Sequence, residues 1–204
     1  MNKNILTFNE WALIGKDEGM EIGHAASVSH MLKLIFKKYK QENFSVIDLG
    51  CGNGWVVRKM KENPLCELAC GIDGSKAMID KAIKNDPGGL YINEDLSIWK
   101  PQEKYDVVFS METLYYFQSP IKILNKIYDS ILKETGILIM GIDHYSENIE
   151  SLNWGETFNL DITTLSIEEW CLLVESAGFN NIKYQQVEKK KNWLGTLIIS
   201  AEKK

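Results

Sequence analysis

From residue 43 onward, the chain alternates short apolar runs rich in β-branched residues with segments of helical periodicity. The apolar runs at 44–50, 67–73, 89–93, 105–110 and 136–142 are typical of buried strands. Strands that alternate with helices need crossover connections, which produce a mostly parallel sheet with helices on both faces. The alternation therefore predicts an α/β fold with a doubly wound sheet.

Two further apolar runs, at 181–188 and 194–202, are separated by only a short polar turn. Such spacing favours antiparallel pairing as a hairpin. Helices are expected at 55–63, 75–86, 119–133 and 166–179, with Ser75 and Ser119 as N-caps. The complete pattern predicts a mostly parallel seven-stranded sheet that includes a terminal antiparallel strand pair.

The chain has 204 residues, of which 45% are hydrophobic, so we expect one principal domain with one buried core, at 43–204. Residues 1–42 contain a helical stretch at 24–40 and are expected to form an N-terminal helical cap. A long polar and aromatic connection, residues 143–164, follows the fifth strand. Long loops inside compact domains are often lids or binding loops, so we expect this segment to be a substrate loop.

Charge and cysteine content argue against several classes of protein. A net charge of −5 argues against a nucleic acid as the main partner. No apolar run approaches the roughly 20 residues of a membrane-spanning helix, and the N-terminus lacks the apolar core of a signal peptide. Cys66 and Cys70 have no second pair of metal ligands nearby. We therefore expect free thiols, no metal site and a reducing, cytoplasmic location.

The segment VIDLGCGNGW, residues 46–55, places three glycines at alternate positions after a strand. They are Gly50, Gly52 and Gly54, and Asp48 precedes them. Ligands of open parallel sheets bind at the carboxyl ends of the strands, and glycine lets them approach the backbone closely. A dinucleotide site requires glycine where Trp55 stands, and the lysine of a P-loop is absent. The loop is expected to bind a different ligand, the alternative being a plain glycine turn.

Two acidic residues follow the next two strands of the predicted sheet. Asp73 stands where its carboxylate can accept hydrogen bonds from both hydroxyls of a ribose. Asp95 can accept from an exocyclic amine. A capping turn before Ser75 is the alternative role of Asp73, and Asp95 is equally explained as a solvated loop acid.

Five blocks of the sequence together resemble the class I S-adenosylmethionine-dependent methyltransferases. The blocks are VIDLGCGNG, GIDGSKAMI, NEDL, YDVVFSMETLYYF and LKETGILIMGI, and their order and spacing match that family over roughly residues 44–203. The resemblance implies a Rossmann-like methyltransferase fold, S-adenosylmethionine as cofactor and S-adenosylhomocysteine as product. The chemistry of the residues agrees, because this cofactor offers an ammonium, a ribose and an adenine but no phosphate.

The resemblance also implies a role for each matching position. The amino-acid end of the cofactor would be held by Asp48 and the glycine loop (Gly50, Gly52, Gly54), and the ribose by Asp73, Gly74 and Ser75. The adenine would pack on Met78 and Leu96, and its amine would meet Asp95. Backbone contacts near the methionine portion would come from Ser110 and Met111.

Methyl transfer from a sulfonium is an in-line displacement, so proximity is the main contribution of the protein, and a base is needed only if the acceptor must lose a proton. His144 follows the fifth strand and could act as that base or bind the acceptor; the alternative is an ordinary loop histidine. Tyr115 and Tyr116 are candidates for shaping the pocket or orienting the acceptor, and Tyr116 stands near where the small-molecule branch of the family often has a histidine. His24 and His30 are expected to be surface or helix residues rather than catalysts.

The fourth-strand block reads SMETLYYF at 110–117, rather than the Asn-Pro-Pro-Tyr type of motif that suggests transfer to an amide or nucleobase nitrogen. We therefore expect methyl transfer to a small-molecule acceptor. The alternatives are a methyltransferase acting on a protein or tRNA, and a non-catalytic S-adenosylmethionine-binding partner or sensor protein.

Overall fold

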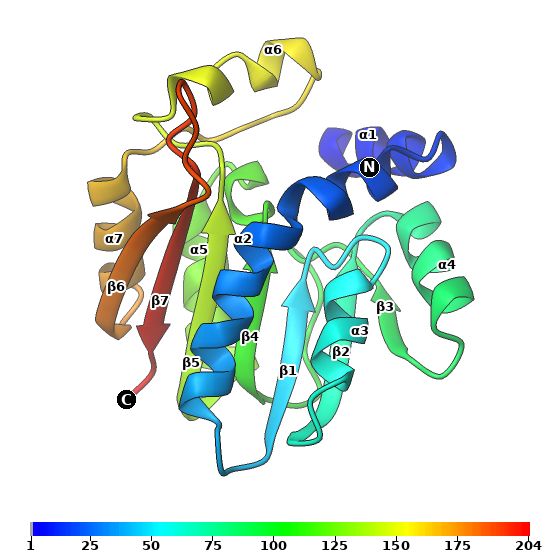
Figure 1. The fold of residues 1–204 in the computed structure, drawn as a ribbon, viewed down its shortest axis with the longest axis vertical. Helices are drawn as coiled ribbons and strands as arrows, with labels where there is room; N and C mark the ends of the chain where they lie inside the picture. Colours follow the sequence, from blue (N-terminus) through cyan, green and yellow to red (C-terminus); the bar gives the residue numbers. More distant parts are fainter. Residues whose placement is uncertain (1) are drawn as a thin grey trace.

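The computed structural model describes residues 2–204. Its centre is a seven-stranded sheet with the strand order β3-β2-β1-β4-β5-β7-β6. The strands are β1 (Phe44–Leu49), β2 (Cys66–Asp73), β3 (Leu90–Asn93), β4 (Tyr105–Met111), β5 (Leu132–Ile142), β6 (Asn180–Val187) and β7 (Thr196–Glu202). Strands β1 to β5 pair in parallel, whereas β7 is antiparallel to both β5 and β6 (Figure 1). The predicted fold class and the terminal antiparallel pair are confirmed.

Helices cover both faces of the sheet (Figure 1). They are α1 (Lys3–Leu13), α2 (Lys16–Lys38), α3 (Trp55–Lys61), α4 (Lys76–Asn85), α5 (Pro120–Lys126), α6 (Trp154–Thr157) and α7 (Ile167–Ser176). Neighbouring residues of the central strands face opposite sides, so Val46 and Val107 pack with α2 and α3, and Ile47 and Val108 pack with α5 and α7. The apolar strands are therefore buried on both faces, as a parallel sheet requires.

Three segments differ from the sequence-based expectation. The N-terminal cap contains the unpredicted helix α1, and α2 begins at Lys16, so that Gly19 and Gly23 lie within it. Burial of Met31 and Ile35 against the sheet outweighs the weak helix propensity of those glycines. The helix expected at 119–133 ends as a π-helical turn, Ile127–Ile131, because β5 already begins at Leu132.

The N-terminal cap and the 143–164 connection meet at the carboxyl ends of the strands. The side-chain amide of Asn4 donates to the backbone carbonyl of Asp161 at 2.8 Å, and the backbone N–H of Asp161 donates back to Asn4 at 2.8 Å. Trp11 of α1 packs edge-to-face on Phe158 with ring centroids 5.5 Å apart. In Figure 1, α1 and α6 accordingly lie beyond the same end of the sheet. None of the helices within 2–204 combines the length and apolarity needed to cross a bilayer.

Helix α7 begins with a capping box. The Ser166 hydroxyl accepts from the Glu169 N–H at 3.1 Å, and the Glu169 carboxylate accepts from the Ser166 N–H at 2.7 Å. Replacing Ser166 with alanine should lower the free energy of unfolding by about 1 kcal/mol, because one backbone donor of the first turn loses its partner. Denaturant unfolding measures this loss. Ser176→Ala, at the exposed opposite end of the same helix, is the control and should change stability much less; equal effects would contradict the capping assignment.

Candidate functional site

A cavity lies at the carboxyl ends of β1, β2 and β4, beneath the N-terminal cap. Ten of the residues selected from the sequence line it: Asp48, Gly50, Gly52, Asp73, Gly74, Met78, Asp95, Leu96, Met111 and Tyr116. They come from four strand ends and from α4, which the parallel topology brings to one edge of the sheet. The structure thus gathers most of the expected cofactor residues around one space.

Four other selected residues do not line the cavity and pack in the structure around it. Ser75 caps α4 by accepting from the Met78 N–H at 3.2 Å. The Ser110 hydroxyl donates to the Leu49 carbonyl at 3.0 Å. Tyr115 is fully buried behind Tyr116, with the two hydroxyl oxygens 3.1 Å apart. Gly54 packs against Tyr91, where a Cβ would lie 2.5 Å from the ring.

His144 also lies outside the cavity lining. Its Nδ1 is 2.9 Å from the Ser151 carbonyl oxygen, and its Nε2 is 2.7 Å from the Thr164 hydroxyl. Both ring nitrogens are therefore occupied by the 143–164 connection, and burial lowers the pKa of the ring. This geometry is that of the alternative expected for His144, an ordinary loop histidine, because both nitrogens bond to the 143–164 connection.

The glycine loop is shaped to admit a ligand. Gly52 has a φ of +53°, and a Cβ at this position would meet only the sulfur of Met78, at 3.9 Å. Both residues line the cavity, so a side chain at position 52 would fill part of it. The Gly52 N–H is fixed by the Asp73 carboxylate at 2.9 Å.

Asp73 joins the loop to the second strand. One of its oxygens accepts from Gly52, and the other accepts from the Ser75 N–H at 2.8 Å. Burial raises the pKa of this carboxyl, while the two backbone hydrogen bonds oppose that shift. Each carboxylate oxygen retains a second lone pair, so Asp73 can hold the loop and still accept from a ligand.

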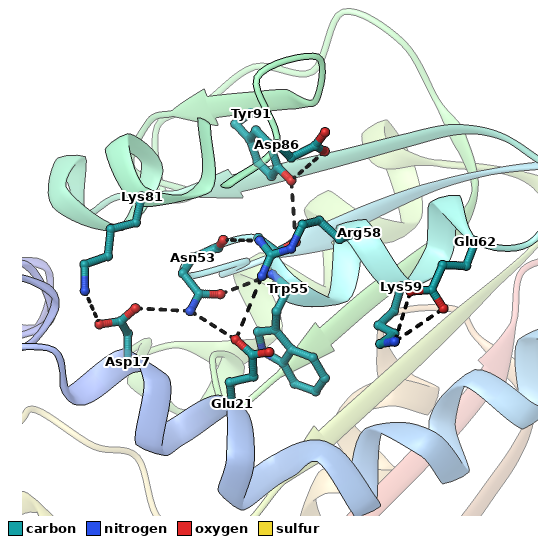
Figure 2. A network of polar contacts seen from close by, with 11 residues as sticks. Asp17, Glu21, Asn53, Trp55, Arg58, Lys59, Glu62, Lys81, Asp86 and Tyr91 are labelled. Carbon is teal, nitrogen blue, oxygen red and sulfur yellow. Dashed lines mark hydrogen bonds and ion pairs between the residues drawn. The ribbon is translucent and has the colours of Figure 1, made fainter. Parts of the chain in front are cut away.

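A polar network that the sequence did not reveal ties the glycine loop to α2 (Figure 2). The buried side chain of Asn53 donates to Asp17 at 3.1 Å and to Glu21 at 3.3 Å, and Arg58 donates to the Asn53 carbonyl at 2.8 Å. Lys81 of α4 completes the network with an ion pair to Asp17 at 2.6 Å. The sequence signal was weak, because Asn53 resembles an ordinary loop residue and its two acidic partners lie more than 30 positions upstream.

A second unpredicted group, which we call the acidic triad, consists of His24, Glu112 and Asp143. One nitrogen or oxygen atom from each lies within 4.8 Å of the others, and His24 Nε2 is 3.8 Å from the Asp143 carboxylate. Burial raises the pKa of both carboxyls, and Asp143 raises that of Glu112 further. Burial lowers the pKa of His24. The group has the composition to hold a proton, a metal ion or another cation, whereas the sequence had indicated no metal site.

Glu112 and Asp143 each directly follow a strand, β4 and β5, which is the signal that could have identified them. Glu112 has a φ of +57°, an uncommon conformation for a residue with a side chain. Its carboxylate accepts from the Tyr115 hydroxyl and the Asp143 N–H. His24 offered no such signal, because its position within α2 places it over the cavity only in the folded chain.

Comparison with known proteins supports the architecture. A family model described as a methyltransferase domain matches residues 23–184. Malonyl-(acyl-carrier protein) O-methyltransferase 2 of Ilyobacter polytropus is 29% identical over 158 residues, which cover 74% of this chain and 56% of that protein. A tRNA U34 carboxymethyltransferase of Histophilus somni is 24% identical over 172 residues, 75% of this chain and 52% of that protein. The matched region is thus about half the length of these curated relatives.

Solved structures show the same fold. A chain of the complex between the Haloferax volcanii Trm112 methyltransferase activator and its methyltransferase superposes with a TM-score of 0.81 and 25% identity, covering 96% of both chains. An S-adenosylmethionine-dependent methyltransferase from Thermotoga maritima superposes with a TM-score of 0.72 and 20% identity, covering 97% of this chain and 98% of that one. With the family match over most of the chain, these findings lead to one conclusion: the chain belongs to the class I S-adenosylmethionine-dependent methyltransferase family.

Proposed function

We propose that the protein transfers a methyl group from S-adenosylmethionine to a small-molecule acceptor in the cavity. The observation that carries this proposal is the open glycine loop at Gly52, held by Asp73 and flanked by the buried Asp48. Asp48 is suited to the cofactor ammonium, and Asp73 to the ribose hydroxyls. Met78 and Leu96 are suited to the two faces of the adenine, with Asp95 at its amine.

When bound, S-adenosylmethionine supplies an electrophilic methyl group on a sulfonium. The side chains beside Met111 then have the task of orienting the acceptor and excluding water. Glu112, Tyr116 and His24 form that part of the wall, and Phe8 of α1 stacks edge-to-face on Tyr116 with centroids 5.1 Å apart. The N-terminal cap would thus close over the acceptor, as the Asn4–Asp161 hydrogen bonds suggest.

A small acceptor is favoured over tRNA because, within residues 2–204, no lysine or arginine lines the cavity. Phosphate backbones are bound mainly by such residues. Relatives of both kinds are similar to this chain. Trans-aconitate 2-methyltransferase of Rhizobium etli is 30% identical over 92 residues, 45% of this chain and 36% of that protein, and the tRNA enzyme of H. somni is described above. A second candidate is a methyltransferase that works with an activator partner, which the similarity to a chain of an activator complex favours.

Transfer of labelled methyl groups distinguishes these acceptors. The protein is incubated with methyl-labelled S-adenosylmethionine and, separately, a metabolite extract, total tRNA or total protein from a bacterial lysate. Label in the metabolite fraction is expected. Label confined to tRNA or protein would contradict the small-molecule proposal, and no label in any fraction would favour the non-catalytic alternative.

Cofactor binding should release a proton. Burial, reinforced by the neighbouring Asp73 carboxylate, raises the pKa of Asp48 well above its usual value. Below that raised pKa the empty site holds a proton, which must leave when the cofactor ammonium pairs with the carboxylate. Affinity should therefore increase with pH until the raised pKa is passed.

Calorimetry in phosphate and in Tris, whose ionisation enthalpies differ, checks this prediction at one pH. Different binding heats in the two buffers are expected for the native protein, and a much smaller difference for Asp48→Asn. Equal heats in both buffers for the native protein would contradict the role of Asp48.

A further inference from the structure

The cavity wall carries acidic side chains without basic ones. Among the described residues, six carboxylates and one histidine line it, and no lysine or arginine does. The carboxylates belong to Asp17, Glu21, Asp48, Asp73, Asp95 and Glu112. An anionic acceptor would approach charges of its own sign in a partly desolvated space, whereas a cation would be attracted.

Most of these carboxylates already have a partner or a proposed ligand. Lys81 pairs with Asp17 at 2.6 Å, and Arg58 lies 3.9 Å from Glu21. Asp48, Asp73 and Asp95 are assigned to the cofactor under the proposed function. Glu112 forms no ion pair with a basic side chain in the part of the chain that the structure describes, and Asp143 behind it has only His24. The acidic triad is therefore the group at the acceptor end whose carboxyls have no lysine or arginine partner within residues 2–204.

The triad has the dimensions of an ammonium site. One nitrogen or oxygen atom from each residue lies within 4.8 Å of the others, so a donor centred among them would be within hydrogen-bond distance of all three. The Oδ1 atom of Asp143 is buried and has no hydrogen-bond partner within residues 2–204. Glu112 accepts two hydrogen bonds, which leaves lone pairs on its carboxylate. An ammonium offers donors for all three positions.

The wall beside the triad suits the rest of such a ligand. Phe8 and Tyr116 line the cavity and present aromatic surface, which attracts organic cations as well as apolar groups. His24 Nε2 lies 3.8 Å from the Asp143 carboxylate, so this nitrogen belongs to the same group as the carboxyls; burial lowers the pKa of the ring, and Asp143 opposes that shift.

We propose that the methyl acceptor is an organic amine, which binds as its ammonium among His24, Glu112 and Asp143 and is methylated on nitrogen. The inference rests on the proposed function and specifies its substrate class. The ammonium first gives a proton to His24 Nε2. The freed lone pair on nitrogen then forms the N–C bond as the C–S bond breaks, and the electron pair of that bond remains on sulfur. The products are the methylated ammonium, neutral S-adenosylhomocysteine and protonated His24, which returns its proton to solvent.

Matched pairs of probes test the preference directly. Calorimetry with the protein saturated with S-adenosylhomocysteine compares methylamine with acetate, 2-phenylethylamine with 3-phenylpropionate, and tryptamine with indole-3-propionate. At least one amine should bind at least about tenfold more tightly than its carboxylate partner, as expected for charged hydrogen bonds in a buried site. Binding of the carboxylates in preference to the amines, or of no amine, would overturn the inference. Failure to bind S-adenosylhomocysteine would instead contradict the proposed function.

Variants locate the preference in the triad. Glu112→Gln should weaken binding of the preferred amine about tenfold or more while leaving affinity for S-adenosylhomocysteine nearly unchanged. Glu62→Gln makes the same change at the exposed residue directly after α3 and should have no effect. Equal amine affinity in the native protein and a folded Glu112→Gln variant would overturn the assignment. The comparison of native-protein probes requires no variant, so it stands even if Glu112→Gln does not fold.

His24→Gln separates binding from proton transfer. The preferred amine should still bind, while turnover falls about a hundredfold or more at neutral pH. Unchanged turnover would exclude His24 as the proton acceptor. A divalent cation is the competing occupant of the triad: amine binding that appears only with added Mg²⁺, Mn²⁺ or Zn²⁺, and is lost in EDTA, would replace the ammonium site with a metal site.

Discussion

Replacing Asp73 with alanine should weaken binding of S-adenosylmethionine by roughly 1.5–3 kcal/mol, about tenfold to more than a hundredfold. Under the proposed function, the variant loses the acceptor for the ribose hydroxyls. It also leaves the N–H groups of Gly52 and Ser75 without the acceptors that they have at 2.9 Å and 2.8 Å, so the glycine loop loses its fixed shape. Calorimetric titration of the folded variant measures the change.

Two variants make this result interpretable. Asp80→Ala removes an exposed carboxylate from α4 that pairs with Lys76 outside the cavity, and it should leave affinity unchanged. Asp73→Asn keeps one oxygen acceptor and should be less damaging than alanine. Native affinity in a folded Asp73→Ala protein would remove Asp73 from the cofactor site.

Replacing Gly52 with valine should abolish detectable binding of the cofactor. An L-residue at a φ of +53° costs roughly 1–2 kcal/mol, and its side chain would project into the cavity beside Met78. Because a Cβ there meets no other atom within 4 Å, the protein is expected to fold while the ligand space is filled. Thermal unfolding with and without S-adenosylmethionine gives both readouts, and the ligand should no longer raise the midpoint.

Gly88→Val is the matched control, since Gly88 also has open space around its Cβ position but lies in the turn before β3, outside the cavity. Its unfolding midpoint should still rise with ligand. A Gly52→Val protein that binds S-adenosylmethionine like the native chain would show that the cofactor does not lie against this loop.

The parts of the fold that were predictable from sequence are those governed by local patterns. Apolar runs with β-branched residues marked every strand, and Ser75 marked the start of α4. Ser119 also stands at the predicted N-cap position, of α5, but its side chain makes no capping hydrogen bond. Residues at the ends of parallel strands, such as Asp48 and Asp73, converge because the topology places those ends at one edge. Their positions in the cavity follow from strand order alone.

The residues that escaped prediction depend on contacts distant in sequence. His24 reaches the cavity because α2 begins at Lys16 and crosses the strand ends. The glycines in the first turns of α2 made this helix start hard to predict from the sequence. His144 looked functional because it follows β5, yet its ring turns toward Ser151 and Thr164. The neighbouring Asp143 faces His24 instead, and sequence position cannot distinguish two adjacent residues that face opposite ways.

The central claim is that the cavity binds S-adenosylmethionine. Calorimetric titration of the purified protein with S-adenosylmethionine, S-adenosylhomocysteine and NAD, each separately, tests it most directly. Binding of the two sulfur compounds without binding of NAD is predicted, because the glycine loop and its acids suit the former and Trp55 stands where a dinucleotide site needs glycine. Binding of NAD alone, or of none of the three, would contradict the account.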